Sequence, residues 1–98
     1  MYIMKKDQNL VLISESLKAI AHPDRISILR LLGQKDSATF SVSEIGDKLD
    51  LSQPEVSRHL SILKNKGVLI FNRVGSNIYY SINKSTVIYQ CIANILSN

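Results

Sequence analysis

The stretch SVSEIGDKLDLSQPEVSRHLSILKNKG, residues 41–67, decides the fold. Its apolar residues recur at helical spacing in two blocks, which predicts one helix over residues 42–49 and a second helix that ends at residues 65–67. About three residues, Asp50 to Ser52, join the two helices, and this is the connection length of a helix-turn-helix. The stretch therefore predicts that motif at the centre of the chain.

Capping residues stand at the start of both helices. Ser52 followed three residues later by Glu55 is a capping box, and Pro54 fits a first helical turn, which does not use the N–H that proline lacks. The shorter helix has two candidate caps, Ser41 and Ser43, and the pattern is compatible with either.

Two further helices are expected before the motif. Apolar residues at helical spacing predict one helix over residues 9–21 and another from Pro23 to a stop at Gly33. His22 lies between them and is expected to cap or to pack at their junction. Residues 34–41 are interpreted as a polar connector.

The hydrophobic period changes after the motif. Residues 68–71 and 78–82 are rich in β-branched and aromatic side chains and predict two strands. Residues 72–77 between them are interpreted as a turn. A small β-hairpin is therefore expected to follow the fourth helix.

The last expected element is a helix that begins at a cap, Asn83 or Ser85, and runs to about residue 96. Its apolar positions form a wide face with almost no charge, and they are Val87, Ile88, Cys91, Ile92, Ile95 and Leu96. The predicted order is α-α-α-α-β-β-α, a mainly α fold with a small β-hairpin (α+β).

The size and composition of the chain suit one folded domain. Its 98 residues are expected to form a flexible lead-in, residues 1–8, and one domain, residues 9–98. No apolar run reaches the roughly 18 residues of a membrane span, and the start lacks the apolar core of a signal peptide. The single cysteine suits a reducing compartment. We therefore expect a cytoplasmic protein without a membrane partner or a cofactor.

The positive charge is confined to the second half of the chain. Residues 1–50 hold seven basic and seven acidic residues, whereas residues 51–98 hold five basic residues and one acidic residue, which gives the net charge of +4. A basic surface attracts polyanions such as nucleic acid. The charge pattern alone is equally compatible with a solvated basic face.

The second helix of the motif carries side chains suited to reading DNA. In a helix-turn-helix this helix enters the major groove, and its early residues meet base edges. Val56, Leu60 and Leu63 share one side and are expected to face the core. The candidate DNA-binding residues on or near the open side are Gln53, Ser57, Arg58 and Ser61. His59 is open to two interpretations, a phosphate contact or packing against the domain.

The predicted hairpin adds a second candidate contact with DNA. Arg73 and Asn77 lie in the turn, and Lys64 lies at the end of the preceding helix. A basic β-turn beside a recognition helix can contact the backbone of the same duplex or its minor groove. The alternative is a solvated hairpin that covers the core.

The chain resembles the arsenic-repressor (ArsR/SmtB) family of bacterial winged helix-turn-helix regulators. The resemblance rests on LKAIAHPDRISILRLLG (residues 17–33), on residues 41–70 and on VGSNIYYSI (residues 74–82), with LSQPEVSRHLSILKNKG as its most specific part. It implies a homodimeric repressor of transcription, relieved by an inducer that is commonly a metal ion or a thiol-reactive species. It also implies DNA contacts from Ser52, Gln53, Ser57, Arg58 and His59, with Arg73 in the wing.

The resemblance further implies a dimer built from the first and last helices. Apolar stripes on these helices are expected to hide against a second copy, because an exposed stripe of this kind must be buried. The residues expected at the interface are Leu10, Ile13, Leu17, Ile88, Cys91, Ile92 and Ile95. Cys91 is interpreted either as a buried small hydrophobe or as a thiol that oxidises or pairs with its copy across the dimer.

The residues with which this family senses metals are missing. Ser41 and Ser43 stand where arsenic and cadmium sensors have cysteines, and a hydroxyl is a poor ligand for a soft metal. Residues 84–98 contain no Asp, Glu or His, which zinc sensors use there. The two histidines, His22 and His59, are expected to be too dispersed for a zinc site. No metal is therefore expected, and any inducer is unknown.

Two other classes of function compete with a DNA-binding repressor. The first is a winged-helix module that binds proteins and not DNA; the basic second half of the chain and Arg58 argue against it. The second is an enzyme. The sequence holds no catalytic-triad spacing, no phosphate loop and no carboxylate pair on a pocket-forming scaffold, so we expect no enzymatic activity.

Overall fold

The computed structural model describes residues 8–34, 39–86 and 88–96, apart from the side chain of Ile95. The elements in chain order are α1 (Gln8–Ile20), α2 (Pro23–Leu32), β1 (Phe40–Ser41), α3 (Val42–Leu49), α4 (Gln53–Asn65), β2 (Leu69–Val74), β3 (Asn77–Ile82) and α5 (Tyr89–Leu96). The predicted mainly helical fold with a small hairpin is confirmed. Residues 1–7 of the expected lead-in and Val87 lie outside the described residues.

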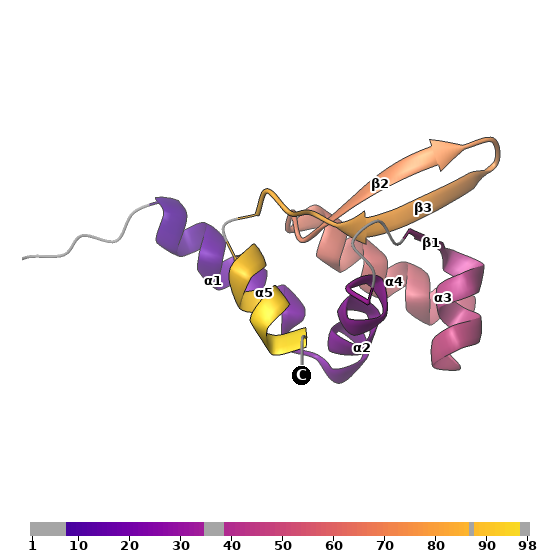
Figure 1. Ribbon diagram of the computed structural model, residues 1–98, viewed down its shortest axis with the longest axis horizontal. Coiled ribbons are helices and arrows are strands. Elements are labelled where there is room, and N and C mark those ends of the chain that lie inside the picture. The colour runs from indigo at the N-terminus through magenta and orange to yellow at the C-terminus, as the bar shows by residue number, and fades with distance from the viewer. Residues whose placement is uncertain (1–7, 35–38, 87, 97–98) are drawn as a thin grey trace, which may run out of the picture.

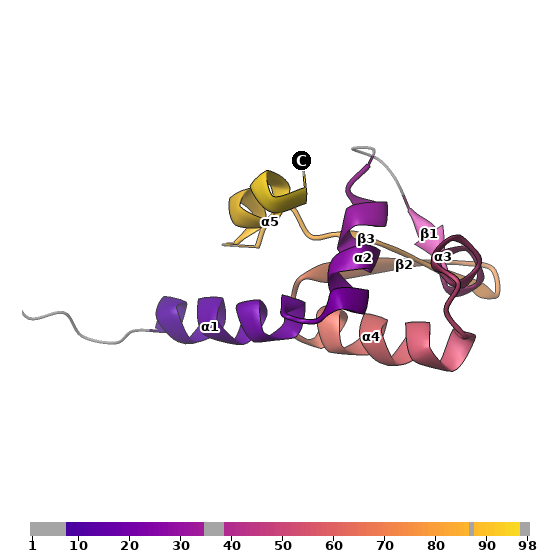
Figure 2. The same cartoon turned by 90° about the horizontal axis from the view of Figure 1, so that it is seen from below.

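The helices α2, α3 and α4 form the body of the domain, and the β2–β3 hairpin projects from it as a wing (Figure 1). Helix α1 extends away from this body, while α5 lies beside α2 (Figure 2). In the described part of the chain, no helix is both long and apolar enough to cross a bilayer.

The centre of the core is the inner face of α4. Val56, Leu60 and Leu63 are completely buried, as their spacing predicted. They pack in one cluster with side chains of α2 and α3, among them Ile28 and Ile45, which are also completely buried. Fully burying such side chains contributes about 1.5–3 kcal/mol each to folding. This packing fixes which side of α4 faces solvent.

The sheet has three antiparallel strands in the order β1-β3-β2, and the expected boundaries of the hairpin were wrong. The turn is two residues long, Gly75–Ser76, because Val74 pairs with Asn77, so that residues 72–74 belong to β2. Gly75 adopts a positive φ of 63°, a conformation that glycine tolerates better than any other residue. The expected connector over residues 34–41 also ends in a strand, since Phe40 pairs with Tyr80 of β3.

Helix α5 begins later than its sequence pattern indicated. Neither Asn83 nor Ser85 caps it, because the helix starts at Tyr89. The amide of Asn83 instead donates from Nδ2 to the carbonyl of Gly67 (2.9 Å), and its Oδ1 accepts from the backbone of Ser85 (3.0 Å). Asn83 therefore closes a turn at the end of β3.

Two residues expected at the dimer interface, Ile88 just before α5 and Ile92 within it, pack on their own protomer. Ile88 and Ile92 are 2% and 3% exposed in the single chain, and both belong to the main core cluster. Side chains buried this deeply in one protomer have no surface to offer a second copy. The expectation that a second copy covers Ile88 and Ile92 was therefore wrong, because the protomer's own core covers them.

We predict that Ile92→Ala destabilises the protomer itself. Removing three carbon atoms from a buried Ile leaves a cavity and lowers the free energy of unfolding by about 2–5 kcal/mol. Denaturant unfolding at one fixed protein concentration measures the change, with Val74→Ala, at a wing position that is 57% exposed, as the matched control. An unchanged free energy of unfolding in Ile92→Ala would show that α5 does not belong to this core.

Candidate nucleic-acid interface

The turn between α3 and α4 is tight. Asp50 ends α3 in the left-handed conformation, with φ 56°, and the backbone N–H of Leu51 donates to the carbonyl of Gly46 (3.0 Å). A Cβ on Gly46 would lie 2.9 Å from the carbonyl oxygen of Leu51, closer than real Cβ contacts come. Glycine at this position therefore lets the two helices approach, and the turn sets the direction of α4.

Both helices of the motif start at capping boxes. Ser41, and not Ser43, caps α3: its hydroxyl accepts from the backbone of Glu44 (3.3 Å). Ser52 caps α4 in the predicted way, and its hydroxyl and backbone N–H bond to Glu55. These bonds from Ser52 hold the pKa of the Glu55 carboxyl below its usual value, because they favour the charged form.

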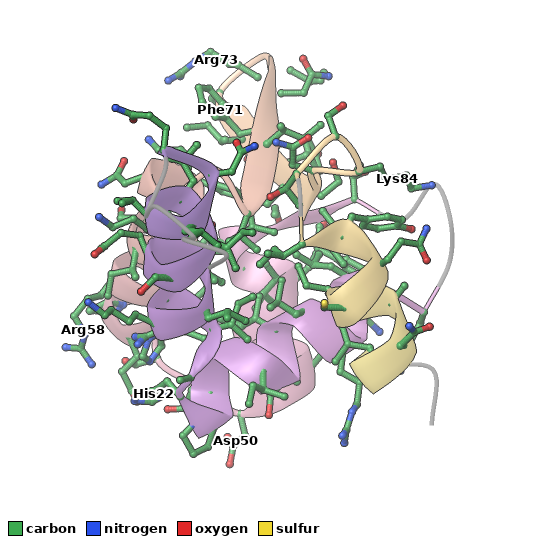
Figure 3. The ribbon with its side chains drawn as sticks, turned by 90° about the vertical axis from the view of Figure 1, so that its left-hand side faces the viewer. His22, Asp50, Arg58, Phe71, Arg73 and Lys84 are labelled. Atoms are coloured by element: carbon green, nitrogen blue, oxygen red, sulfur yellow. The ribbon has the colours of Figure 1, made fainter. Side chains whose placement is uncertain are left out.

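The open face of α4 carries the predicted polar side chains. Gln53, Ser57, Arg58 and Ser61 are all exposed, as is the cap Ser52. The amide of Gln53 donates to the hydroxyl of Ser43 (2.9 Å), so one contact between the two helices of the motif orients a candidate base-reading side chain. Figure 3 shows Arg58 extending beyond the ribbon, with Arg73 at the wing.

The wing places its polar residues near its tip. Arg73 and Asn77 are exposed, on paired strands next to the two-residue turn. The ammonium of Lys64 lies 5.1 Å from the centre of the Phe71 ring, a cation–π contact that holds the end of α4 against β2. Since Asn77 pairs with Val74, the side chains of Arg73 and Asn77 point to opposite faces of the hairpin, and Arg73 shares its face with Phe71.

His59 occupies the buried side of α4, which selects packing over the phosphate contact. The residue is 2% exposed, so the DNA contact implied by the resemblance is wrong for His59. Arg25 of α2 donates from Nη1 to His59 Nδ1 (3.3 Å), and His59 Nε2 lies 3.5 Å from a carboxylate oxygen of Asp24. The rings of His22 and His59 are in contact, with 4.7 Å between their centres.

These contacts define the protonation of His59. Arginine is always a donor, so Nδ1 must accept and the ring proton lies on Nε2, facing Asp24. Burial lowers the pKa of His59 most, His22 and Arg25 lower it further, and Asp24 opposes them. The ring is therefore neutral at neutral pH.

The same residues have the spacing of a metal site but not its chemistry. Ligand atoms of His22, Asp24 and His59 lie within 4.8 Å of one another, and within the described ranges no other group of three has this spacing. The expectation that the two histidines are dispersed was wrong, because α2 and α4 bring them together. However, Arg25 occupies Nδ1 of His59, and His22 Nδ1 accepts from the backbone of Asp24 as the cap of α2. The expected cap role of His22 is confirmed.

The structure adds information on two further residues. Cys91 is exposed in the protomer, so its own chain does not bury it. The sequence pattern gave no reason to single out Arg25, although its side chain contacts both α1 and α4. The only local signal is that Arg25 lies in the first turn of α2, and this does not reveal a partner 34 residues away.

Comparisons with known proteins agree with this geometry. A family model described as a helix-turn-helix domain matches residues 20–69. The chain is 40% identical over 75 residues to the transcriptional repressor SdpR of Bacillus subtilis, and the match covers 76% of this chain and 79% of SdpR.

Two solved structures have a similar fold. HlyU from Vibrio cholerae superposes with a TM-score of 0.80 at 28% identity, covering 92% of this chain and 94% of HlyU. The transcriptional repressor PagR of Bacillus anthracis superposes with a TM-score of 0.73 at 36% identity, covering 90% of this chain and 92% of PagR. Both likenesses include the helix-turn-helix and the hairpin wing.

Proposed function

The chain belongs to the arsenic-repressor family of winged helix-turn-helix transcription regulators, and from this premise we propose that it represses transcription by binding an inverted-repeat operator in double-stranded DNA as a homodimer. The observation that carries the proposal is the division of α4 into a fully buried apolar face and an exposed polar face. Its relatives SdpR and PagR are named as repressors.

The exposed face of α4 is assigned to base reading. Arg58 can grip a guanine at two atoms, Gln53 can grip an adenine, and Ser57 or Ser61 can bond to a base or a phosphate. Ser52 uses both its hydroxyl and its backbone N–H in the capping box with Glu55, so a DNA contact from Ser52 would have to replace one of these bonds.

The wing and the end of α4 are assigned to the DNA backbone. Arg73 and Asn77 are exposed near the tip of the wing, and Lys64 lies at the end of α4 against Phe71 of β2. Contacts of this kind position a protein on the duplex without reading its sequence.

The homodimer is assigned mainly to α1. Four large apolar side chains on this helix are 45–56% exposed in the protomer: Leu10, Val11, Leu12 and Leu17. Leu10 and Leu17 lie two turns apart on the side opposite the buried Ser16 and Ala19, and Ile13 is half-buried near them. Pairing with a second copy would remove this apolar surface from water. On α5, Cys91 is exposed and Ile95 has no described side chain.

Other assignments have less support. Regulators of this family are not enzymes, and a protein-binding module would not need the polar outer face of α4. A soft-metal inducer at the start of α3 is disfavoured, because the hydroxyl of Ser41 caps the helix and that of Ser43 accepts from Gln53.

Selection of bound duplexes from a random pool tests the proposal directly. We predict a motif with two-fold symmetry, whose half-sites lie about one helical turn (~34 Å) or a multiple of it apart. Because several cations would displace counterions from phosphates, the logarithm of affinity should fall steeply with the logarithm of salt concentration. A motif without symmetry, or an affinity insensitive to salt, would contradict the proposal.

Arg58→Ala and Arg73→Ala should differ in kind. Loss of Arg58 should cost about 1–3 kcal/mol on the selected duplex and relax the base preference at one position of the half-site. Loss of Arg73 should weaken all duplexes alike and reduce the salt slope by about one unit per protomer. Competition with single-base variants measures both effects. If the two mutants lost base preference equally, the division between α4 and the wing would be wrong.

Leu17→Asp should produce a folded monomer. Leu17 is 46% exposed in the protomer, so the protomer tolerates the carboxylate, whereas an interface that buries it does not. DNA affinity should fall as well, because half-site binding loses the gain from linkage. Analytical sedimentation measures the change, and Asn9→Asp, which adds the same charge at an exposed position of α1, is the control. A Leu17→Asp dimer as stable as the wild type would place the interface elsewhere.

A further inference from the structure

One guanidinium connects the helix assigned to the dimer with the helix assigned to DNA. Arg25, in the first turn of α2, donates from Nε to the carbonyl of Ala19 near the end of α1. The same side chain donates from Nη1 to Nδ1 of the buried His59 in α4 (3.3 Å). Arg25 therefore fixes a point on α4 relative to the end of α1.

The remaining sides of the His59 ring are occupied by the start of α2. His22 lies against the ring, with 4.7 Å between the ring centres, and the carboxylate of Asp24 lies 3.5 Å from Nε2. His22 is itself held, since its Nδ1 accepts from the backbone N–H of Asp24 (3.1 Å). The contacts of His59 thus come from the N-cap and the first turn of α2.

These contacts are compatible only with a neutral His59 ring. Nδ1 must keep its lone pair for Arg25, while the proton on Nε2 faces Asp24. A second proton, on Nδ1, would turn an acceptor into a donor that points at a guanidinium. The Nη1 group of Arg25 would lose its acceptor, and two cations would meet in a buried site.

We propose that Arg25 and neutral His59 act as a proton-sensitive bracket that positions α4 for DNA, so that protonation of His59 weakens operator binding. Arg25, Asp24 and His59 are positioning residues in this account, which rests on the proposed function. His59 directly follows Arg58, the residue assigned to base reading. A displacement of α4 at His59 therefore moves Arg58, whose contact with a base depends on hydrogen-bond geometry.

The direction in which DNA affinity changes with pH distinguishes this bracket from a direct attraction between histidine and phosphate. A histidine near phosphates binds DNA more tightly as it gains charge, so its affinity rises in acid. The bracket predicts the reverse, because the proton is taken up only when α4 is released. Proton uptake that opposes binding lowers affinity by at most about tenfold per pH unit for each protomer.

The charges around His59 set the pH range in which this happens. Burial lowers the pKa of His59 from the ordinary 6.5, and the positive charges of His22, Arg25 and Arg58 lower it further. The carboxylate of Asp24 raises this pKa. Glu55 is the acidic residue on the same helix as His59. The unfolded state therefore binds more protons than the folded state. The stability that neutral His59 confers is full above the ordinary pKa and falls as the pH drops below it.

The test uses the fact that the chain has two histidines. His59→Gln keeps an acceptor for Arg25 and a donor towards Asp24 but cannot titrate. His22→Asn removes the other histidine and keeps an N-cap for α2. The affinity of each full-length variant for the selected duplex is measured by fluorescence anisotropy from pH 7.5 to 5.0 at constant ionic strength.

We expect the wild-type protein and His22→Asn to lose affinity as the pH falls, and His59→Gln to lose little or to gain. Equal pH profiles for the wild type and His59→Gln would overturn the proposal, and so would tighter wild-type binding in acid. Arg25→Gln supplies a second variant if His59→Gln does not fold. Loss of the Arg25 cation raises the pKa of His59. The DNA affinity of Arg25→Gln should therefore begin to fall at a higher pH than that of the wild type. A pH profile equal to that of the wild type would reject the role of Arg25.

A measurement without DNA keeps this inference separate from the proposed function. Ring nitrogen chemical shifts of the free protein report which nitrogen of each histidine carries the proton. We expect His59 to be neutral at pH 7 with its proton on Nε2. A proton on Nδ1, or a charged ring at that pH, would reject the bracket whether or not the protein binds DNA. If no duplex is selected but the shifts are as expected, the proposed function fails and the buried network stands.

Discussion

The burial of one face of α4 is the constraint on which the rest of the structure depends. Val56, Leu60 and Leu63 lose all contact with solvent inside the cluster formed with α2 and α3. A helix with one face so fixed must present its other face outward, and here that face carries Gln53 and Arg58. The same packing brings His59 under α2, where Arg25 and Asp24 meet it. Core packing, the candidate reading surface and the buried polar network are therefore three consequences of one helix orientation.

Features that depend on near neighbours could be predicted from the sequence. The helix-turn-helix and the Ser52–Glu55 cap follow from residues within a few positions of one another, and both were correct. Features that depend on distant partners could not be predicted in this way. The strand β1 exists because Phe40 pairs with Tyr80, and the contact between His22 and His59 exists because two helices cross. The sequence pattern fits Ser41 and Ser43 equally well as caps of α3, and only the backbone geometry identifies Ser41 as the cap.

The dimer surface shows a different limit of pattern analysis. Apolar spacing indicates that a face must be buried, but it does not say whether the same chain or a second copy covers it. The stripes of α1 and α5 look alike in the sequence, yet Ile88 and Ile92 lie in the core while Leu10 and Leu17 are about half exposed. A domain of this size needs most of its apolar residues for its own core. In the protomer, Ile88 and Ile92 complete the core, whereas the large apolar side chains of α1 stay about half exposed.

The crystal structure of the protein bound to its selected duplex would test the central claim most directly, since the orientation of α4 is both the basis of the fold and the basis of recognition. The account predicts α4 in the major groove with Arg58 and Gln53 at hydrogen-bond distance from base edges, Arg73 at the backbone, and two protomers paired through α1. His59 should remain buried against Arg25. A complex in which DNA contacts another face, or in which α4 is covered by protein, would contradict the account.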